Sequence, residues 1–267
     1  MTDKLFAVVG DDARQAAAGR ALARAGFQVG GPGQIGWADY ILLPLPLDVE
    51  AVGLAGLLRS AKPGALALAG KPSAEARRLA REAGITMVDY FAREELTVLN
   101  AIPTAEGCIG ILLERRVRTL WDAPVLVTGY GPVGQALAVR LTALGAHVTV
   151  AARRASQRAL ARSQGAHWVI PLEELAAAAP GFDAVVNTIP ALVLTRPVLA
   201  ALRPGSLIVD LASRPGGTDF AAAAALGHTA LPALSLPVRC APESAGEYVA
   251  NTVLEIIRER VEQEAAG

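Results

Sequence analysis

Six consecutive residues near the middle of the chain form a glycine-rich turn of the GxGxxG type: Gly129, Tyr130, Gly131, Pro132, Val133 and Gly134. An apolar segment that begins at Val125 precedes this turn, and an amphipathic helical pattern and a second apolar segment follow it. Between a strand and a helix, such glycines let the backbone approach a pyrophosphate, and the helix N-terminus offers it free N–H groups. The pattern therefore predicts a dinucleotide-binding turn rather than a merely tight connection.

Basic residues follow the second apolar segment, and no carboxylate stands there. A site that prefers NAD places Asp or Glu at this position to bind the ribose 2′-hydroxyl, whereas guanidinium groups suit a 2′-phosphate. Arg153 and Arg154 occupy the position, and Ser156 follows shortly after. We therefore predict that NADP is the cofactor, against the alternative that both arginines are ordinary solvated side chains.

A polar segment directly follows the apolar strand predicted over residues 184–187. In a doubly wound sheet the carboxyl ends of the strands lie over the cofactor. We therefore predict that Asn187, Thr188 and Ile189 contact the ribose or the nicotinamide. The alternative is a polar turn that Pro190 ends.

A second polar segment follows the next predicted strand and combines a carboxylate, a hydroxyl and a guanidinium on Asp210, Ser213 and Arg214. The pair of glycines that comes after them is able to supply N–H donors, and a guanidinium binds a substrate carboxylate in bidentate fashion. We predict that these three side chains are catalytic or bind substrate. The alternative is a capping loop with a solvated arginine, in which Thr218 or Asp219 caps the next helix.

A third polar segment opens a long helix predicted over residues 104–120, and its Glu106 is a further candidate acid–base group. Capping of that helix by Thr104, with Glu106 in the first turn for its helix dipole, explains the same residues without a ligand. The 3 histidines and all the lysines fall outside the three segments. The His or Lys acid–base partner of an alcohol dehydrogenase is therefore not visible.

The elements that must position these residues alternate between apolar strands and helical patterns along the whole chain, which is typical of α/β architecture with parallel sheets. We predict a flavodoxin-like N-terminal α/β domain over residues 1–118 and a Rossmann NADP-binding domain over 119–240, linked by helices. The helix over 241–267 either caps the second domain or crosses back to the first. We expect ligands between the two domains.

Composition excludes several classes of protein. The 267 residues are 52% hydrophobic and carry 25 basic and 25 acidic side chains, so there is no basic field for nucleic acid. The 2 cysteines lack metal-ligand spacing, and we predict neither a metal site nor a disulfide framework. The chain shows no signal-peptide layout and no uninterrupted apolar stretch of membrane-spanning length. We therefore expect a cytoplasmic protein without a membrane partner.

The glycine turn with its basic strand end, together with four longer segments, resembles the family of dipicolinate synthase A subunits. These segments are NTIP, NAIPTAEG, DLASRPGGTDF and the tail LPALSLPVRCAPESAGEYVANTV. The resemblance covers nearly the whole chain, and DLASRPGGTDF is more specific than any Rossmann motif because it is long and unusual.

This resemblance implies an N-terminal α/β domain and an NADP-binding Rossmann domain, arranged as in 2-hydroxyacid dehydrogenases. It implies oxidation of a dihydrodipicolinate-type intermediate of lysine biosynthesis to pyridine-2,6-dicarboxylate (dipicolinate) in sporulation, and its implied partner is the flavoprotein-like B subunit of dipicolinate synthase. Arg214 and Ser213 would then hold a carboxylate of the small dicarboxylate substrate. Two alternative functions stay open: another NADP-dependent 2-hydroxyacid or amino-acid dehydrogenase, and a non-catalytic NADP-binding scaffold. Assembly into a homo-oligomer also stays open.

Overall fold

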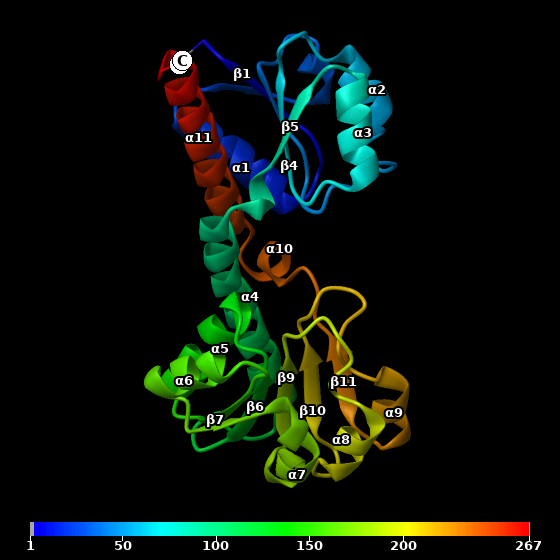
Figure 1. The fold of residues 1–267 in the computed structure, drawn as a ribbon, viewed down its shortest axis with the longest axis vertical. Coiled ribbons are helices and arrows are strands. Elements are labelled where there is room, and N and C mark those ends of the chain that lie inside the picture. Colours follow the sequence, from blue (N-terminus) through cyan, green and yellow to red (C-terminus); the bar gives the residue numbers. More distant parts are fainter. Residues whose placement is uncertain (1–2, 267) are drawn as a thin grey trace. The chain divides into compact units, whose positions relative to one another are not determined.

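Two parallel β-sheets, each covered by helices on both faces, make up the protein (Figure 1). The computed structural model describes residues 3–266. Unit 1 comprises the described residues up to Asn100 and those from Ala241 onward, and unit 2 comprises Ala101–Cys240. The α/β fold class predicted from the alternating patterns is confirmed.

The sheet of unit 1 has the strand order β2-β1-β3-β4-β5, which is the flavodoxin-like order. Its strands are β1 (Leu5–Val8), β2 (Gln28–Gly30), β3 (Tyr40–Leu42), β4 (Leu66–Ala69) and β5 (Thr86–Asp89). One face is covered by α2 (Leu54–Ser60) and α3 (Ala74–Glu82), and the other by α1 (Ala13–Arg24) and α11 (Pro242–Ala266). The short 3₁₀ helices of this unit are η1 (Pro32–Gln34) and η2 (Tyr90–Ala92).

The side chains of β4 show how one strand serves both faces of this sheet. Ala67 and Ala69 point toward α2 and α3, while Leu66 and Leu68 join the cluster beneath α1 and α11. Helices α1 and α11 run side by side in Figure 1, and a Cβ atom added to Gly246 would lie 2.5 Å from Ala17 Cβ. The C-terminal helix therefore belongs to the core of unit 1.

The sheet of unit 2 has the order β11-β10-β9-β6-β7-β8. Counted from β8 and numbered within the unit, this is third, second, first, fourth, fifth, sixth, the order of the Rossmann fold. The strands are β6 (Pro124–Thr128), β7 (His147–Ala151), β8 (Trp168–Ile170), β9 (Ala184–Asn187), β10 (Leu207–Asp210) and β11 (Thr229–Pro232). The Rossmann topology predicted for this part of the chain is confirmed.

Helices cover both faces of the second sheet as well. One face carries α4 (Glu94–Arg115), α5 (Pro132–Ala143), α6 (Ala155–Ser163) and α10 (Leu236–Cys240). The other carries α7 (Leu175–Ala178), α8 (Arg196–Ala201), α9 (Phe220–Ala225) and the 3₁₀ helices η3 (Leu172–Glu174) and η4 (Ala179–Gly181). Alternate residues of β6 face the two layers, with Val125 and Val127 on one side and Leu126 on the other.

The long helix differs from its prediction over residues 104–120, because α4 begins at Glu94 and ends at Arg115. Proline lacks an N–H and usually ends a helix, yet Pro103 lies inside α4. Its carbonyl accepts a hydrogen bond from Cys240 Sγ at 3.1 Å. Thr104 therefore does not cap the helix, and Glu106 does not lie in its first turn.

The boundary between the units also lies earlier than expected. It falls between Asn100 and Ala101, inside α4, rather than between residues 118 and 119. The reason is that Ala105, Cys108 and Leu112 of α4 are buried in the core of unit 2.

Among residues 3–266, α4 is the one helix long and apolar enough to cross a membrane by length and composition, with a mean hydropathy of 1.6 over an 18-residue window. Its Ala105, Cys108 and Leu112 are fully buried against the second sheet, and burial raises the pKa of the Cys108 thiol to about 12. Through these three residues α4 packs against the second sheet.

Candidate nucleotide-binding site

The strand order of unit 2 reverses between β6 and β9, its two central strands. In open α/β sheets ligands bind outside the carboxyl ends of the strands at such a point. The glycine turn follows β6, and Thr188 and Ile189 follow β9. Both segments line one pocket of about 460 Å³, together with Arg153 and Arg154 at the end of β7. The structure thus brings most of the predicted cofactor residues to one place.

Each glycine of the turn has its own structural reason. A Cβ atom on Gly129 would lie 2.3 Å from Thr188 Oγ1, and one on Gly134 would lie 2.3 Å from the Gly129 carbonyl oxygen. Gly129 also has a φ of +92°, which favours glycine. A Cβ atom on Gly131 would meet nothing within 4 Å. The first and third glycines are therefore required by packing, while the second leaves open space where a ligand can approach the backbone.

The turn leads directly into the N-terminus of α5. Gly131 is the N-cap residue, and Pro132, which has no N–H, is the first residue of the helix. The N–H groups of Val133 and Gly134 lie in the first turn, where a helix leaves its donors without an intrahelical partner. These donors and the helix dipole fit the pyrophosphate of a dinucleotide.

Tyr130 holds the turn in place from the interior. Its side chain is buried, its hydroxyl donates to Gln164 Oε1 at 2.6 Å, and burial raises the pKa of the phenol. Its carbonyl accepts from Gln135 Nε2 at 3.2 Å and from Gln157 Nε2 at 3.4 Å. Gln157 also lines the pocket, as do three residues that carry no signal in the sequence: Leu172, Ala191 and Val193.

The basic strand end is held by a third arginine. Arg158 Nη1 donates to the carbonyls of Ala152 and Arg153, each at 2.8 Å, and so fixes the chain where β7 ends. Arg153 and Arg154 are exposed, line the pocket, and have no side-chain partner within the described part of the chain. Ser156 is exposed in the first turn of α6 and does not line the pocket.

A buried row of polar side chains runs across the ends of three neighbouring strands. Thr128, Asn187 and Asp210 are the last residues of β6, β9 and β10, and they stand in register. Thr128 Oγ1 donates to Asn187 Oδ1 at 2.7 Å, and Asn187 Nδ2 donates to Asp210 Oδ1 at 2.9 Å. The row ties the central strands together beneath the pocket.

Asn187 acts through this row rather than on a ligand. Its Oδ1 also accepts from the Ile189 N–H at 3.1 Å, and its Nδ2 also donates to the Ile189 carbonyl at 3.0 Å. An amide has two donors and an acceptor oxygen with two lone pairs, so all its hydrogen-bonding capacity is used. The predicted direct contact of Asn187 with the cofactor is therefore replaced by a role in shaping the Thr188–Ile189 loop.

Asp210 plays the matching part for the second polar loop. Its carboxylate is 2% exposed and accepts from the N–H groups of Ala212, at 3.0 Å, and Gly217, at 2.9 Å. A Cβ atom on Gly217 would lie 2.4 Å from the Ile189 carbonyl, so the two loops touch. The prediction that Asp210 is a catalytic carboxylate is not supported, because its hydrogen-bond partners all belong to the scaffold. The N–H of Gly217 is likewise occupied, and that of Gly216 donates to the Ser213 carbonyl at 2.9 Å.

Ser213 and Arg214 stand exposed at the tip of this loop, and the Arg214 guanidinium has no partner among residues 3–266. Neither lines the 460 Å³ pocket. Glu106 is exposed too, and one of its carboxylate oxygens lies 3.7 Å from Arg140 Nε. Asp219 caps α9 by accepting from the Ala222 N–H at 2.9 Å.

The three histidines lie at the other end of the sheet. His147 begins β7, His167 precedes β8, and His228 precedes β11, with its Nε2 2.8 Å from the Leu199 carbonyl. Unit 2 therefore presents no imidazole at the carboxyl ends of its strands. Within residues 3–266 there is also no group of three or more His, Cys, Asp or Glu side chains arranged to hold a metal ion.

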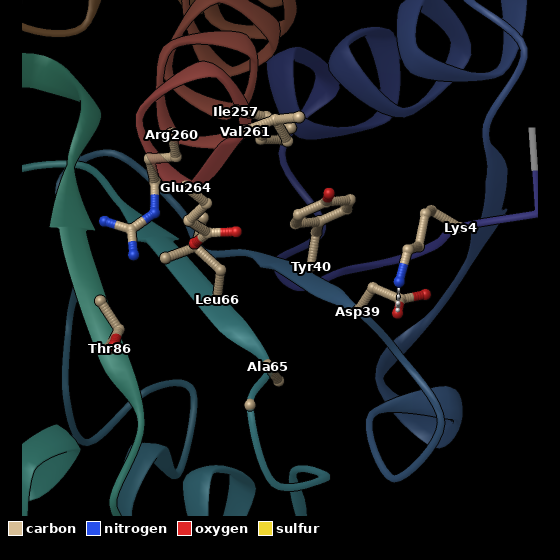
Figure 2. A pocket seen from close by; sticks show the side chains of 11 residues that line it. Lys4, Asp39, Tyr40, Ala65, Leu66, Thr86, Ile257, Arg260, Val261 and Glu264 are labelled. Atoms are coloured by element: carbon tan, nitrogen blue, oxygen red, sulfur yellow. Dashed lines mark hydrogen bonds and ion pairs between the residues drawn. The ribbon is translucent and has the colours of Figure 1, made fainter. Parts of the chain in front are cut away.

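Unit 1 has a smaller pocket of about 280 Å³, shown in Figure 2. It lies where β3, β4 and β5 begin, at the end of the sheet opposite to the one where such folds bind ligands. Its lining combines apolar side chains with two positive and two negative groups, namely Lys4, Arg260, Asp39 and Glu264. Because these charges balance, the pocket offers no net field for a charged ligand.

Asp39 is the most strongly perturbed carboxylate of this pocket. Burial alone would raise its pKa from 3.8, but hydrogen bonds from Lys62, the Leu5 N–H and Lys4 outweigh burial and lower the pKa to about 2. The Oδ1 atom lies 2.8 Å from Lys62 Nζ and 2.9 Å from Lys4 Nζ. The folded state therefore favours the ionised carboxylate.

Asp39→Asn is expected to reduce the free energy of unfolding of unit 1 near neutral pH by about 1 kcal/mol, a value that allows for the solvent around both lysines. Because the folded pKa is depressed, the contribution is complete above about pH 4 and is lost as the pH falls toward about 2. Urea unfolding from pH 6 down to pH 2 measures it, followed by fluorescence in a Trp121→Phe, Trp168→Phe background in which Trp37 is the one remaining tryptophan. Asp11→Asn, on an exposed carboxylate, is the control, and a constant difference between Asp39→Asn and wild type across this range would contradict the assignment.

Comparison with known proteins agrees with this geometry. The family model for the alanine dehydrogenase/PNT C-terminal domain, a domain that binds nicotinamide nucleotides, matches residues 100–230. The A subunit of dipicolinate synthase from Bacillus subtilis (strain 168) is 36% identical over 192 residues, which cover 71% of this chain. The matched stretch spans 64% of that relative's own length, less than two thirds.

Two crystal structures are similar over nearly the whole chain. The A chain of dipicolinate synthase from Bacillus subtilis has 30% sequence identity and a TM-score of 0.86, with 98% of each chain covered. The corresponding A subunit from Bacillus halodurans has 29% identity and a TM-score of 0.87, with 96% of this chain and 98% of that chain covered. Unit 2 is thus a nicotinamide-nucleotide-binding domain of the dehydrogenase type, and the chain belongs to the family of dipicolinate synthase A subunits.

Proposed function

We propose that this protein is the A subunit of a dipicolinate synthase, which oxidises a dihydrodipicolinate-type dicarboxylate to pyridine-2,6-dicarboxylate with NADP. Family membership supports the reaction class, and the two free arginines at the end of β7 support the phosphorylated cofactor. The observation that carries the substrate assignment is the unpartnered guanidinium of Arg214, on a loop that is fastened to the cofactor-side loop.

The preference for NADP rests on charge at one place. Arg153 and Arg154 line the nucleotide pocket without a carboxylate partner, and no Asp or Glu occurs between Asp122 and Glu173. A 2′-phosphate would receive two charge-assisted contacts there and would meet no like charge. The ribose of NAD would find no carboxylate to accept its 2′-hydroxyl.

Arg214 is suited to one carboxylate of a dicarboxylate substrate. Asp210 positions the loop that carries Arg214, and Gly217 of that loop contacts the Ile189 segment. The buried row of Thr128, Asn187 and Asp210 therefore positions both the loop proposed to bind substrate and the loop proposed to contact the nicotinamide. The Ser213 hydroxyl, adjacent in the chain, adds a second donor. A bidentate guanidinium contact fixes both the position and the orientation of a carboxylate.

The chemistry makes small demands on acid–base groups. A bound nicotinamide would supply the hydride acceptor. Removal of a hydride and a proton from the dihydropyridine ring leaves an aromatic pyridine, which makes the reaction strongly downhill. Water or the exposed Glu106 carboxylate then suffices to accept the proton, consistent with the absence of an imidazole at this edge of unit 2.

We further propose that the protein acts in the cytoplasm of a sporulating cell together with the flavoprotein-like B subunit. This part rests on the family alone. Assembly into a homo-oligomer is compatible with it.

Arg214→Ala tests the substrate assignment. We expect kcat/KM for dipicolinate formation to fall by about 30- to 150-fold, because a charge-assisted contact worth roughly 2 to 3 kcal/mol is lost. The affinity for NADPH should stay unchanged. Spectrophotometric turnover with a dihydrodipicolinate source, with and without the B subunit, measures the first quantity, and a direct titration measures the second.

Arg196→Ala, which removes an exposed arginine of α8, is the matched control and should leave kcat/KM unchanged. Equal kcat/KM for Arg214→Ala and wild type would remove Arg214 from the carboxylate role. One alternative function, a non-catalytic NADP-binding scaffold, has structural support, because the hydrogen bonds of Asp210 to the protein leave this carboxylate no free role as an acid or base. A chain that binds NADPH but never turns over, even with the B subunit, is a scaffold protein.

A further inference from the structure

A second pocket of unit 2 lies at the amino ends of the strands that hold the nucleotide site at their other ends. It has a volume of about 650 Å³ and is lined by residues between Arg116 and Pro124, by Asp183 and by Arg203 with Pro204. Pro124 begins β6, and Asp183 directly precedes β9. The pocket is therefore separated from the glycine turn by the length of a strand, roughly 15 Å.

Positive charge exceeds negative charge in this pocket. Of its two carboxylates, Asp183 forms an ion pair with Arg116, and Asp122 lies 2.7 Å from His147 Nε2. Arg118 has no partner in the part of the chain that the structure describes. Arg203 uses only its Nε, which donates to the Pro180 carbonyl at 3.2 Å. Two guanidinium groups thus remain available, which favours a ligand with two negative charges.

Arg116, which also lines this pocket, has a buried hydrogen-bond donor without a partner among the described residues. Its side chain is 6% exposed, and its Nε is buried without a hydrogen-bond partner among the described residues. A buried donor without a partner destabilises the folded state, because it has lost its hydrogen bonds to water. An acceptor that enters the pocket would relieve that cost.

Trp121 supplies an aromatic surface beside these charges. The residue is 69% exposed, although indole is a large apolar group. Its backbone N–H donates to Thr119 Oγ1 at 3.2 Å, and a Cβ atom on Gly145 would lie 2.6 Å from the indole Cδ1. One edge of the ring is therefore held against the protein while most of its surface is free to stack on a flat ligand.

We propose that this pocket is an accessory site that binds an aromatic dicarboxylate. Arg118 precedes β6 and Arg203 precedes β10, and these strands are separated in the sheet by β9. The amino ends of these two strands are thus roughly 10 Å apart. This spacing suits carboxylates at two positions of one ring better than a single phosphate. Pyridine-2,6-dicarboxylate has this chemistry, so product binding is a corollary that rests on the proposed function, whereas the site itself does not.

The test uses the full chain labelled with ¹⁵N and benzene-1,3-dicarboxylate as the probe. The protein has 3 tryptophans, and the indole N–H signal of Trp121 is assigned by its loss in Trp121→Phe. We expect a saturable shift of the Trp121 signal in the presence of excess NADPH, with no shift of Trp37 in unit 1. Arg118→Ala with Arg203→Ala should weaken binding by at least about tenfold. Both side chains are exposed, and unchanged NADPH affinity verifies that the variant is folded.

Any one of these results would overturn the proposal: no shift of Trp121 at millimolar probe, equal affinity in the double variant, or tighter binding of AMP than of the dicarboxylate. Sulfate, which carries the charge without the ring, should bind more weakly than the probe, and equal binding would also contradict an aromatic site. These experiments distinguish a failure of the accessory-site proposal from a failure of the proposed function. Arg214→Ala should lose turnover and keep the Trp121 shift, while the double variant should keep turnover and lose the shift.

Discussion

Arg153→Ala combined with Arg154→Ala is expected to weaken NADPH binding by about 100-fold while changing NADH binding by less than about threefold. Both guanidinium groups line the nucleotide pocket and are free of other partners in the described structure. Each charge-assisted contact of these exposed arginines with a 2′-phosphate is worth roughly 1.5 kcal/mol, and about 1.4 kcal/mol corresponds to tenfold in affinity, so two contacts give about 100-fold. NADH lacks the phosphate and should lose almost nothing.

Titration of both nucleotides at one fixed ionic strength measures this effect, since salt screens exposed charges. Arg162→Ala, an exposed arginine near the end of α6, removes the same charge outside the pocket and should alter neither affinity. Equal weakening of NADH and NADPH, or no weakening of either, would refute the assignment of these arginines to the phosphate.

Asp210→Ala should have the largest effect on stability, a loss of about 3 to 5 kcal/mol in the free energy of unfolding of unit 2. The substitution leaves three buried donors without an acceptor: Asn187 Nδ2 and the N–H groups of Ala212 and Gly217. Each costs about 1 to 3 kcal/mol when it stays unpaired. Because Asn187 shapes the Ile189 loop, nucleotide affinity should fall as well.

Urea unfolding followed by fluorescence in a Trp37→Phe background, where the remaining Trp121 and Trp168 both lie in unit 2, measures the loss of stability. Asp219→Ala is the matched control, because it removes a carboxylate that only caps α9 and should cost about 1 kcal/mol. If the Asp210 variant unfolded at the same urea concentration as this control, the buried row would not be the element that holds the two loops.

Much of this fold is predictable because each element carries a local signal. The strand predicted over residues 184–187 and the strand predicted before the second polar segment are both found, since short apolar runs in this chain are bounded by polar or turn residues. The glycine turn and its arginines are predictable for a similar reason. Their spacing alone places them on one strand–turn–helix unit.

The roles of Asn187 and Asp210 are not predictable from single segments. In the sequence, a polar residue at the end of a strand is the same whether its side chain contacts a ligand or the end of a neighbouring strand. The register between the strands decides which contact it makes. A signal is nevertheless present: PVLVT, AVVN and LIVD each end in their one polar residue, and the Rossmann order makes these strands neighbours. The start of α4 is not predictable for a different reason. A proline usually marks a helix boundary, but Pro103 lies inside α4, where tertiary packing accommodates it.

The placement of α11 has a consequence for how the protein is made. Val249, Val253 and Ile256 complete the apolar cluster that also contains Phe6 and Leu22, yet they are translated after the whole of unit 2. During synthesis, the contiguous unit 2 has all its strands before α11 leaves the ribosome. The part of this face that α1 does not cover stays exposed for that time, so the nascent chain presents apolar surface of the first sheet to solvent until α11 is made.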